Sequence, residues 1–187
     1  MLILGAALVL VLLVPLAGGR FGNLARLRLR GTWLVVAALL VQIVVISIVT
    51  DAPEWVSKTF HLSTYVALGV FVLLNRRVPF MWVLVLGVLA NFVVIAANGG
   101  VMPASATALR SAGRAVKKGF NNSAVLSHPR LRFLGDVFST PRSLPMANVF
   151  SVGDVVLVVG LVLMAFAVTR TDVDADVPYL RPLEDAV

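Results

Sequence analysis

Two aspartates, Asp136 and Asp154, are the residues whose type and spacing point most directly to chemistry in this chain of 187 residues. Asp154 is the only acidic residue inside an apolar run, where a carboxylate is costly and needs a reason. If the two carboxylates approach closely, the pair shares a proton. One of them then activates water while the other protonates a carbonyl or leaving group. The pair therefore predicts a catalytic acid-base dyad.

A structural role for Asp154 is the alternative interpretation. The aspartate follows Ser151 at a spacing of three residues, immediately before a long apolar run. A serine and an acidic residue at this spacing are typical of a capping box, and a carboxylate there also suits the positive end of the helix dipole. The sequence thus leaves a catalytic pair and a helix cap open for Asp154.

Three asparagines are expected at the same end of the helices as the two aspartates. Asn98 ends an apolar run, Asn91 lies two helical turns before it, and Asn148 precedes the last apolar run. Polar groups in a low-dielectric environment need hydrogen-bond partners. We therefore expect Asn91, Asn98 and Asn148 to support Asp136 and Asp154 in one polar cluster.

Composition places these residues in a membrane protein. The chain is 59% hydrophobic and only 13% charged, whereas a soluble domain is about a quarter charged. It has no cysteine, which excludes disulfides, thiolate metal sites and cysteine nucleophiles. The histidines His61 and His128 stand alone, so we expect neither a metal site nor a cofactor. The net charge of +7 fits basic helix ends at anionic headgroups better than nucleic-acid binding.

The apolar runs predict an all-α polytopic fold with about five transmembrane helices. Residues 1–170 would form a single transmembrane domain with an outer segment at 101–148, and residues 171–187 an acidic cytoplasmic tail. The expected spans cover residues 1–19, 32–50, 61–74 (starting near 56), 78–97 and 149–168.

The loop at residues 20–31 carries four arginines and is expected in the cytoplasm. The amino terminus would then lie outside the membrane-enclosed compartment and the carboxyl terminus in the cytoplasm. Basic residues total eight on each side, so this orientation depends on giving short loops more weight than the long outer segment.

Part of the outer segment has the pattern of an amphipathic helix. Apolar residues recur at spacings of three and four from Leu109 to Phe120, and basic residues occupy another face. Such a helix lies in the membrane interface and contacts lipid headgroups. The basic residues expected to make these contacts are Arg110, Arg114, Lys117 and Lys118.

Two resemblances follow from these motifs. The order NGGVMP, LGD, then PMANVFSVGDVVLVVG on a short five-span chain resembles the bacterial membrane family called domain of unknown function 5317. That resemblance implies a small protein of the bacterial inner membrane. Residues 135–160 are also similar to the end of the lipoprotein signal peptidase family, a membrane aspartyl protease. That resemblance covers about a seventh of the chain and implies that Asp136 and Asp154 match the dyad of that family, at the outer face.

Two functions are expected from these observations. The first is a non-enzymatic accessory, scaffolding or lipid-interacting subunit that carries a polar cluster on its outer face. Its partners would be membrane lipids and a larger membrane complex. The alternative is a membrane-embedded aspartyl hydrolase, similar to lipoprotein signal peptidase, that uses Asp136 and Asp154.

Overall fold

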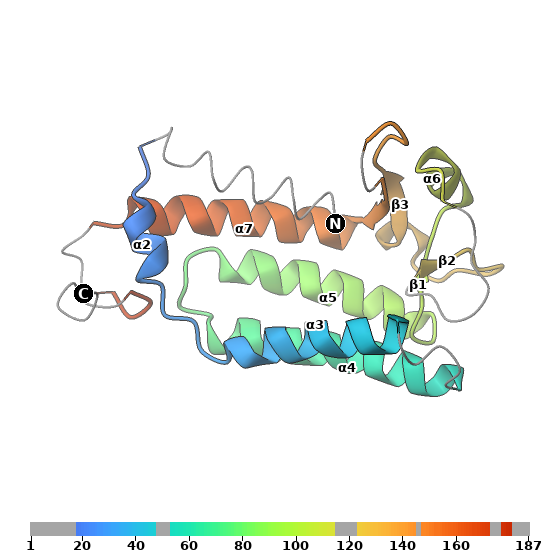
Figure 1. Ribbon diagram of the computed structural model, residues 1–187, viewed down its shortest axis with the longest axis horizontal. Helices are drawn as coiled ribbons and strands as arrows, with labels where there is room; N and C mark the ends of the chain where they lie inside the picture. The colour runs from blue at the N-terminus through green and yellow to red at the C-terminus, as the bar shows by residue number, and fades with distance from the viewer. Residues whose placement is uncertain (1–17, 48–52, 115–122, 145–146, 173–176, 181–187) are drawn as a thin grey trace.

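The structure is a computed structural model that describes residues 18–47, 53–114, 123–144, 147–172 and 177–180. The described chain is mostly helical. Figure 1 shows long helices lying along one axis, with short strands gathered at one end of them. The long helices are α3 (Thr32–Ser47), α4 (Glu54–Leu74), α5 (Met81–Ala97) and α7 (Val152–Arg170).

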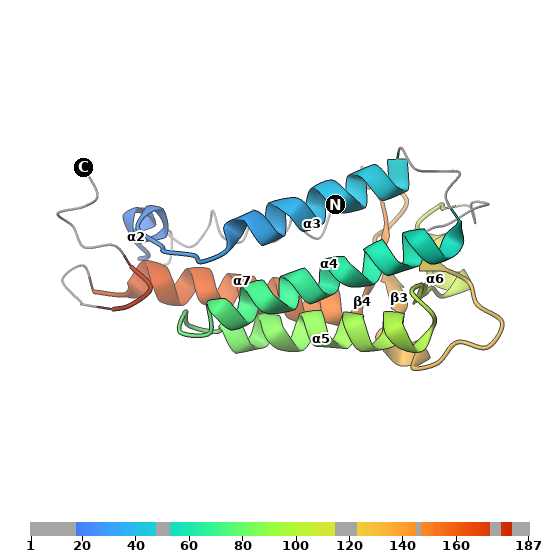
Figure 2. The same ribbon diagram turned by 90° about the horizontal axis from the view of Figure 1, so that it is seen from below.

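The long helices contact one another in the order α3, α4, α5, α7. Helix α5 packs against both α4 and α7, while α3 packs against α4. Figure 2 shows α3 on the side of α4 that faces away from α5. The main buried cluster includes Val72, Val88 and Val168, which come from α4, α5 and α7 respectively. These three helices therefore form the packed centre on which the candidate site is built.

Two of the described helices are long and apolar enough to cross a membrane. They are Trp55–Leu74, within α4, and Val152–Arg170, which is α7. Shorter apolar helices cover Thr32–Val41 and Met81–Ala97. The sequence predicts five transmembrane helices, and the described residues contain two candidates. Residues 1–17 of the expected first span lie outside the described residues.

The surfaces of these helices are strongly apolar. The three tryptophans, Trp33, Trp55 and Trp82, are 68%, 70% and 63% exposed. Several large aliphatic side chains on the same helices, including Leu40, Ile43 and Leu73, are also more than half exposed. Extended apolar surface of this kind marks a face that contacts lipid or another protein. Together with the two long apolar helices, this surface fits association with a membrane.

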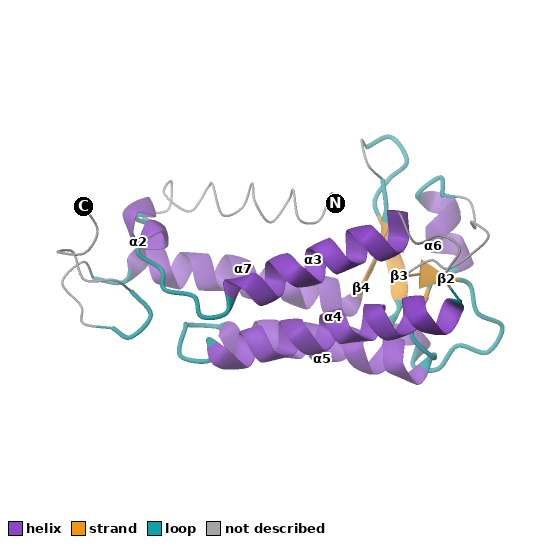
Figure 3. Ribbon diagram, turned by 60° about the horizontal axis from the view of Figure 1, so that its bottom comes forward, coloured by secondary structure: helices purple, strands orange, loops and turns teal. Residues whose placement is uncertain are grey.

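The expectation of an all-α fold is wrong at one end of the bundle, where short strands occur (Figure 3). The strands β1 (Met102–Pro103) and β2 (Ser123–Ala124) pair in parallel. The strands β3 (Asp136–Ser139) and β4 (Val149–Ser151) pair antiparallel, with an irregularity after Asp136. Segments this short carry too little apolar alternation to be recognised in the sequence. They join the outer segment to the start of α7.

The end of α5 follows the sequence prediction closely. The Gly100 N–H donates to the Ile95 carbonyl at 2.9 Å, and the Gly99 N–H donates to the Ala96 carbonyl at 3.2 Å. Gly99 has a φ of 65° and Gly100 a φ of 92°. These bonds form a Schellman motif, which glycine favours because it has no Cβ to clash. The turn directs the chain from α5 into β1.

The predicted amphipathic helix is shorter than expected. The helix α6 (Ala106–Ser111) ends before Gly113, which has a φ of 65°, so Arg114 lies beyond it. Its buried residue Ala108 packs in a small protein core, where an interfacial helix would face lipid. Arg110 and Arg114 are exposed, whereas Lys117 and Lys118 lie outside the described residues. Lipid contact by these four basic residues stays a prediction.

Candidate functional site

Asp154 lies in the first turn of α7, where it forms a capping box with Ser151. The Asp154 N–H donates to Ser151 Oγ at 3.0 Å, and the Ser151 N–H donates to Asp154 Oδ2 at 2.9 Å. Each residue therefore satisfies a backbone donor that the helix end leaves without a partner. The capping box that the sequence predicts for Ser151 and Asp154 is therefore present in the structure.

Asn91 connects this cap to α5. Its Nδ2 donates to Asp154 Oδ1 at 2.9 Å, and its Oδ1 accepts a hydrogen bond from Ser151 Oγ at 2.8 Å. Asn91 and Ser151 are both fully buried, at 2% and 0% exposed. Both oxygens of the Asp154 carboxylate thus accept hydrogen bonds from the protein itself. The three side chains tie α5 to α7 across 63 residues of sequence.

The close approach of α5 and α7 depends on Gly153. A Cβ at this position would lie 2.1 Å from Asn91 Oδ1 and 2.9 Å from the Gly87 carbonyl oxygen. Real Cβ atoms are not found at such distances. A glycine next to Asp154 therefore leaves the space that the Asn91 amide occupies.

Asp136 is buried at the start of β3 and is 5% exposed. The Ser123 hydroxyl donates to its Oδ2 at 2.5 Å, and its backbone carbonyl accepts from the Ser105 N–H at 2.9 Å. The pKa of Asp136 is raised to about 6, chiefly by burial; the Ser123 hydrogen bond lowers the pKa, and the negative charge of Asp154 raises it. Asp136 is therefore a carboxyl group that takes up and releases a proton near neutral pH.

The two aspartates are brought into one region by the β3–β4 pairing. Asp136 is the strand partner of Ser151, the residue that caps α7 and bonds to Asp154. The charge of Asp154 acts on Asp136, but each carboxylate has its own hydrogen-bond donors among the described residues. The structure thus assembles a polar cluster of Asn91, Ser123, Asp136, Ser151 and Asp154. Direct proton sharing between the aspartates stays a prediction.

Residues 26–166 match the family of unknown function DUF5317, which is more than half of the chain. The chain belongs to this family. The matched region runs from the arginine-rich loop into α7 and contains the whole polar cluster, so the resemblance to DUF5317 is confirmed. No curated protein and no solved structure matches the chain. The resemblance to lipoprotein signal peptidase is not shown by these comparisons.

In this DUF5317 chain, Asn98 does not join the polar cluster through a hydrogen bond. Its Nδ2 donates to the carbonyls of Val94 and Arg130, at 2.7 and 2.8 Å, and its Oδ1 accepts from the Arg130 N–H at 2.8 Å. The side chain therefore fastens the outer segment to the end of α5. This is a local structural role that the sequence did not reveal, because Arg130 is 32 residues away.

Asn148 closes the hairpin between β3 and β4. Its N–H donates to Thr140 Oγ1 at 2.8 Å, and its carbonyl accepts from the Thr140 N–H at 2.9 Å. These contacts are made by the main chain of Asn148. Support of the aspartates by Asn98 and Asn148 thus stays a prediction, whereas Asn91 bonds to Asp154 directly.

Ser123 belongs to the polar cluster but is not predicted by the sequence. It lies in the outer segment, and nothing in its local sequence marks it as the donor to Asp136. His61 is buried, its Nδ1 lies 3.0 Å from the Gly100 carbonyl oxygen, and its ring meets the edge of the Tyr65 ring. Among the described residues, no group of three His, Cys, Asp or Glu side chains could hold a metal ion.

Proposed function

We propose that this chain is a multi-pass protein of the bacterial inner membrane that serves as a non-catalytic accessory, scaffolding or lipid-interacting subunit. One observation carries the proposal. Both carboxylate oxygens of Asp154 are held by Asn91 and Ser151, so the conspicuous acid in α7 already has a complete set of structural partners. The cluster then serves to fix the outer segment on the helices, and the apolar helix faces serve for contact with lipid or partner subunits.

Purification in a mild non-ionic detergent tests the accessory role. Blue-native electrophoresis of solubilised membranes should show the chain in an assembly larger than the protein alone, with partners that co-purify. If the protein migrates alone and captures no partner, the scaffolding version is wrong. Resistance to carbonate extraction tests membrane integration separately, because peripheral proteins are released by that treatment.

The proposal includes five spans, with the amino terminus outside and the carboxyl terminus inside. The absence of native cysteine allows a direct test with single-cysteine variants. Ser143→Cys reports on the outer segment and Asp172→Cys on the end after α7, since both positions are exposed. A membrane-impermeant maleimide should label the Ser143→Cys protein in intact cells and label the Asp172→Cys protein only after lysis. The reverse pattern would show that the orientation is inverted.

A second candidate, an aspartyl hydrolase acting on a membrane-inserted substrate, is favoured by Asp136. This carboxyl group is buried, and its pKa is raised to about 6, in part by the negative charge of Asp154. A general acid with a pKa near the working pH is well suited to proton transfer. Cells producing Asp136→Asn should then accumulate uncleaved membrane substrates relative to the wild type. N-terminal peptide mass spectrometry that finds no difference removes this candidate.

A further inference from the structure

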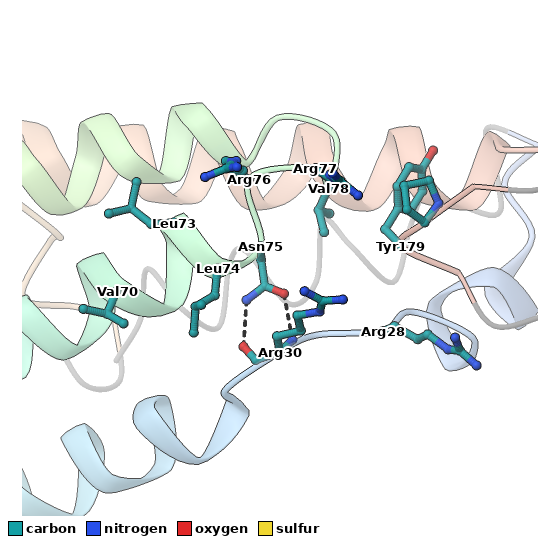
Figure 4. A pocket seen from close by; sticks show the side chains of 11 residues that line it. Arg28, Arg30, Val70, Leu73, Leu74, Asn75, Arg76, Arg77, Val78 and Tyr179 are labelled. Atoms are coloured by element: carbon teal, nitrogen blue, oxygen red, sulfur yellow. Dashed lines mark hydrogen bonds between the residues drawn. The ribbon is translucent and has the colours of Figure 1, made fainter.

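A basic cavity lies at the end of the bundle opposite the polar cluster. Its volume is about 410 Å³. Figure 4 shows that its arginines come from two loops far apart in sequence. Arg28 and Arg30 lie in the loop before α3, while Arg76 and Arg77 lie in the turn between α4 and α5. None of the described residues that line the cavity is acidic.

The buried side chain of Asn75 holds the two arginine loops together. The Arg30 N–H donates to Asn75 Oδ1, and Asn75 Nδ2 donates to the Arg30 carbonyl, both at 2.8 Å. The same amide also donates to the Phe71 carbonyl at 2.7 Å, which fixes it on the end of α4. Asn75 is 4% exposed, so these bonds are protected from water. The backbone positions of the arginines are therefore set before any ligand arrives.

The carboxyl-terminal segment closes another side of the cavity. The Arg28 N–H donates to the Tyr179 carbonyl at 2.8 Å, and Leu27 forms an antiparallel bridge with Leu180. Leu180 is buried in the same apolar cluster as the ends of α4 and α7. The cavity is thus built from three separate chain segments and is not merely a row of basic residues on one loop.

The chemistry of the lining identifies a class of ligand. Guanidinium groups form forked hydrogen bonds that match phosphate oxygens, and several of them from different directions can surround one anion. The apolar residues Val70, Leu73 and Leu74 line the cavity from α4 and are exposed. A ligand with a phosphate at one end and an acyl chain at the other would satisfy both parts of this surface. Basic pockets at the ends of transmembrane helices bind such headgroups.

We propose that this cavity binds a phosphate-bearing anion, and that the neighbouring apolar residues favour the phosphodiester of an anionic membrane lipid over free phosphate. The proposal rests on the lipid-interacting function above and gives it a location and a ligand class. Arg76 and Arg77 supply charge from the α4–α5 turn, and Asn75 is a positioning residue that acts through Arg30.

The test compares two double variants of the full chain in mixed micelles. Arg76→Gln with Arg77→Gln removes two charges at the cavity, while Arg130→Gln with Arg132→Gln removes two exposed charges near the opposite end of α5, where the Arg130 backbone bonds to Asn98. Binding of phosphatidylglycerol, with phosphatidylcholine as the neutral reference, is followed through thermal stability and tryptophan fluorescence. We expect the cavity variant to bind phosphatidylglycerol about thirtyfold more weakly, if each arginine contributes as a basic residue does near an anionic surface. The control variant should stay within about twofold of the wild type.

Inorganic phosphate forms the second arm of the experiment. If millimolar phosphate alone stabilises the wild type but not the cavity variant, the ligand is a free phosphate. If only phosphatidylglycerol does so, the ligand is a lipid headgroup. Equal effects of the two double variants would overturn the proposal, because binding would then follow total charge alone.

Two further measurements separate the possible failures. Should the double cavity variant fold poorly, Arg77→Gln alone gives a milder change, and it should still weaken phosphatidylglycerol binding more than Arg132→Gln. If wild-type protein resists carbonate extraction but shows no preference for the anionic lipid, this inference is wrong while the membrane proposal stands. If the wild type is extracted, the proposed function itself is wrong.

Discussion

Replacement of Gly153 by alanine tests the packing of the polar cluster most directly. The new Cβ would lie 2.1 Å from Asn91 Oδ1, 2.6 Å from its Cγ and 2.9 Å from the Gly87 carbonyl oxygen. The Asn91 side chain can move away only by giving up its bonds to Asp154 and Ser151. The Gly87 carbonyl is backbone, so α5 and α7 would also have to separate.

The expected cost follows from these two effects. Each lost hydrogen bond contributes about 1 kcal/mol, and overpacking of a close interface typically costs about 1–3 kcal/mol. Alanine recovers up to about 1 kcal/mol relative to glycine in a helix. We expect Gly153→Ala to lower the free energy of unfolding by about 2–4 kcal/mol, equivalent to a melting temperature about 5–15 °C lower.

Gly69→Ala provides the matched control. Gly69 lies within α4, and a Cβ there would meet nothing within 4 Å. The same substitution should therefore leave the protein equally stable or make it slightly more stable. Thermal unfolding of both variants in the same mild detergent, followed by tryptophan fluorescence, measures the difference.

A double variant distinguishes a steric clash with Asn91 from a general effect on α7. Asn91→Ala removes the atoms that the new Cβ would strike, so Gly153→Ala should cost less in that background than in the wild type. The described geometry of the cluster is wrong if Gly153→Ala has the same melting temperature as the wild type. It is also wrong if Gly153→Ala lowers the free energy of unfolding by the same amount with and without Asn91→Ala.

Three other predictions follow from the cluster and its surroundings. Asp154→Ala removes the capping box and should lower the unfolding free energy by about 1–2 kcal/mol in thermal melts, whereas loss of a merely exposed charge would have no measurable effect. The folded-state pKa of Asp136 is raised to about 6, so its contribution to stability is full below about pH 4 and is lost as the pH rises through 6. Between pH 4 and 7 the free energy of unfolding of the wild type should therefore fall by up to about 3 kcal/mol relative to that of Asp136→Asn. A difference in unfolding free energy that stays constant across this range would contradict the burial of the carboxyl group. Asn98→Ala removes the side-chain hydrogen bonds to the Arg130 backbone and should speed tryptic cleavage after Arg130. Cleavage after Arg77, in the turn between α4 and α5, serves as the internal reference.

Local sequence rules correctly predicted the cap of α7 and the turn that ends α5. The capping box of Ser151 and Asp154 depends only on residues three apart, and the turn at Gly99 and Gly100 depends on φ values that glycine adopts readily. Both were therefore readable from the sequence. The strands could not be predicted, because segments of two to four residues give no periodic signal. The length of α6 was overestimated, because the apolar spacing in the sequence continues past Gly113, where the helix has already ended.

Sequence alone thus determined an apolar, mostly helical chain with an acid at the start of its last helix and arginines in its short loops. Tertiary structure decided which of these residues meet. Asn91 reaches Asp154 across 63 residues, and Asn75 joins the loops of Arg30 and Arg77 across 45. These contacts depend on which helix faces pack together, and helix packing is set by the complementary shapes of both partners, such as the space left by Gly153. The spacing of residues along the sequence does not predict which helix faces are complementary in shape.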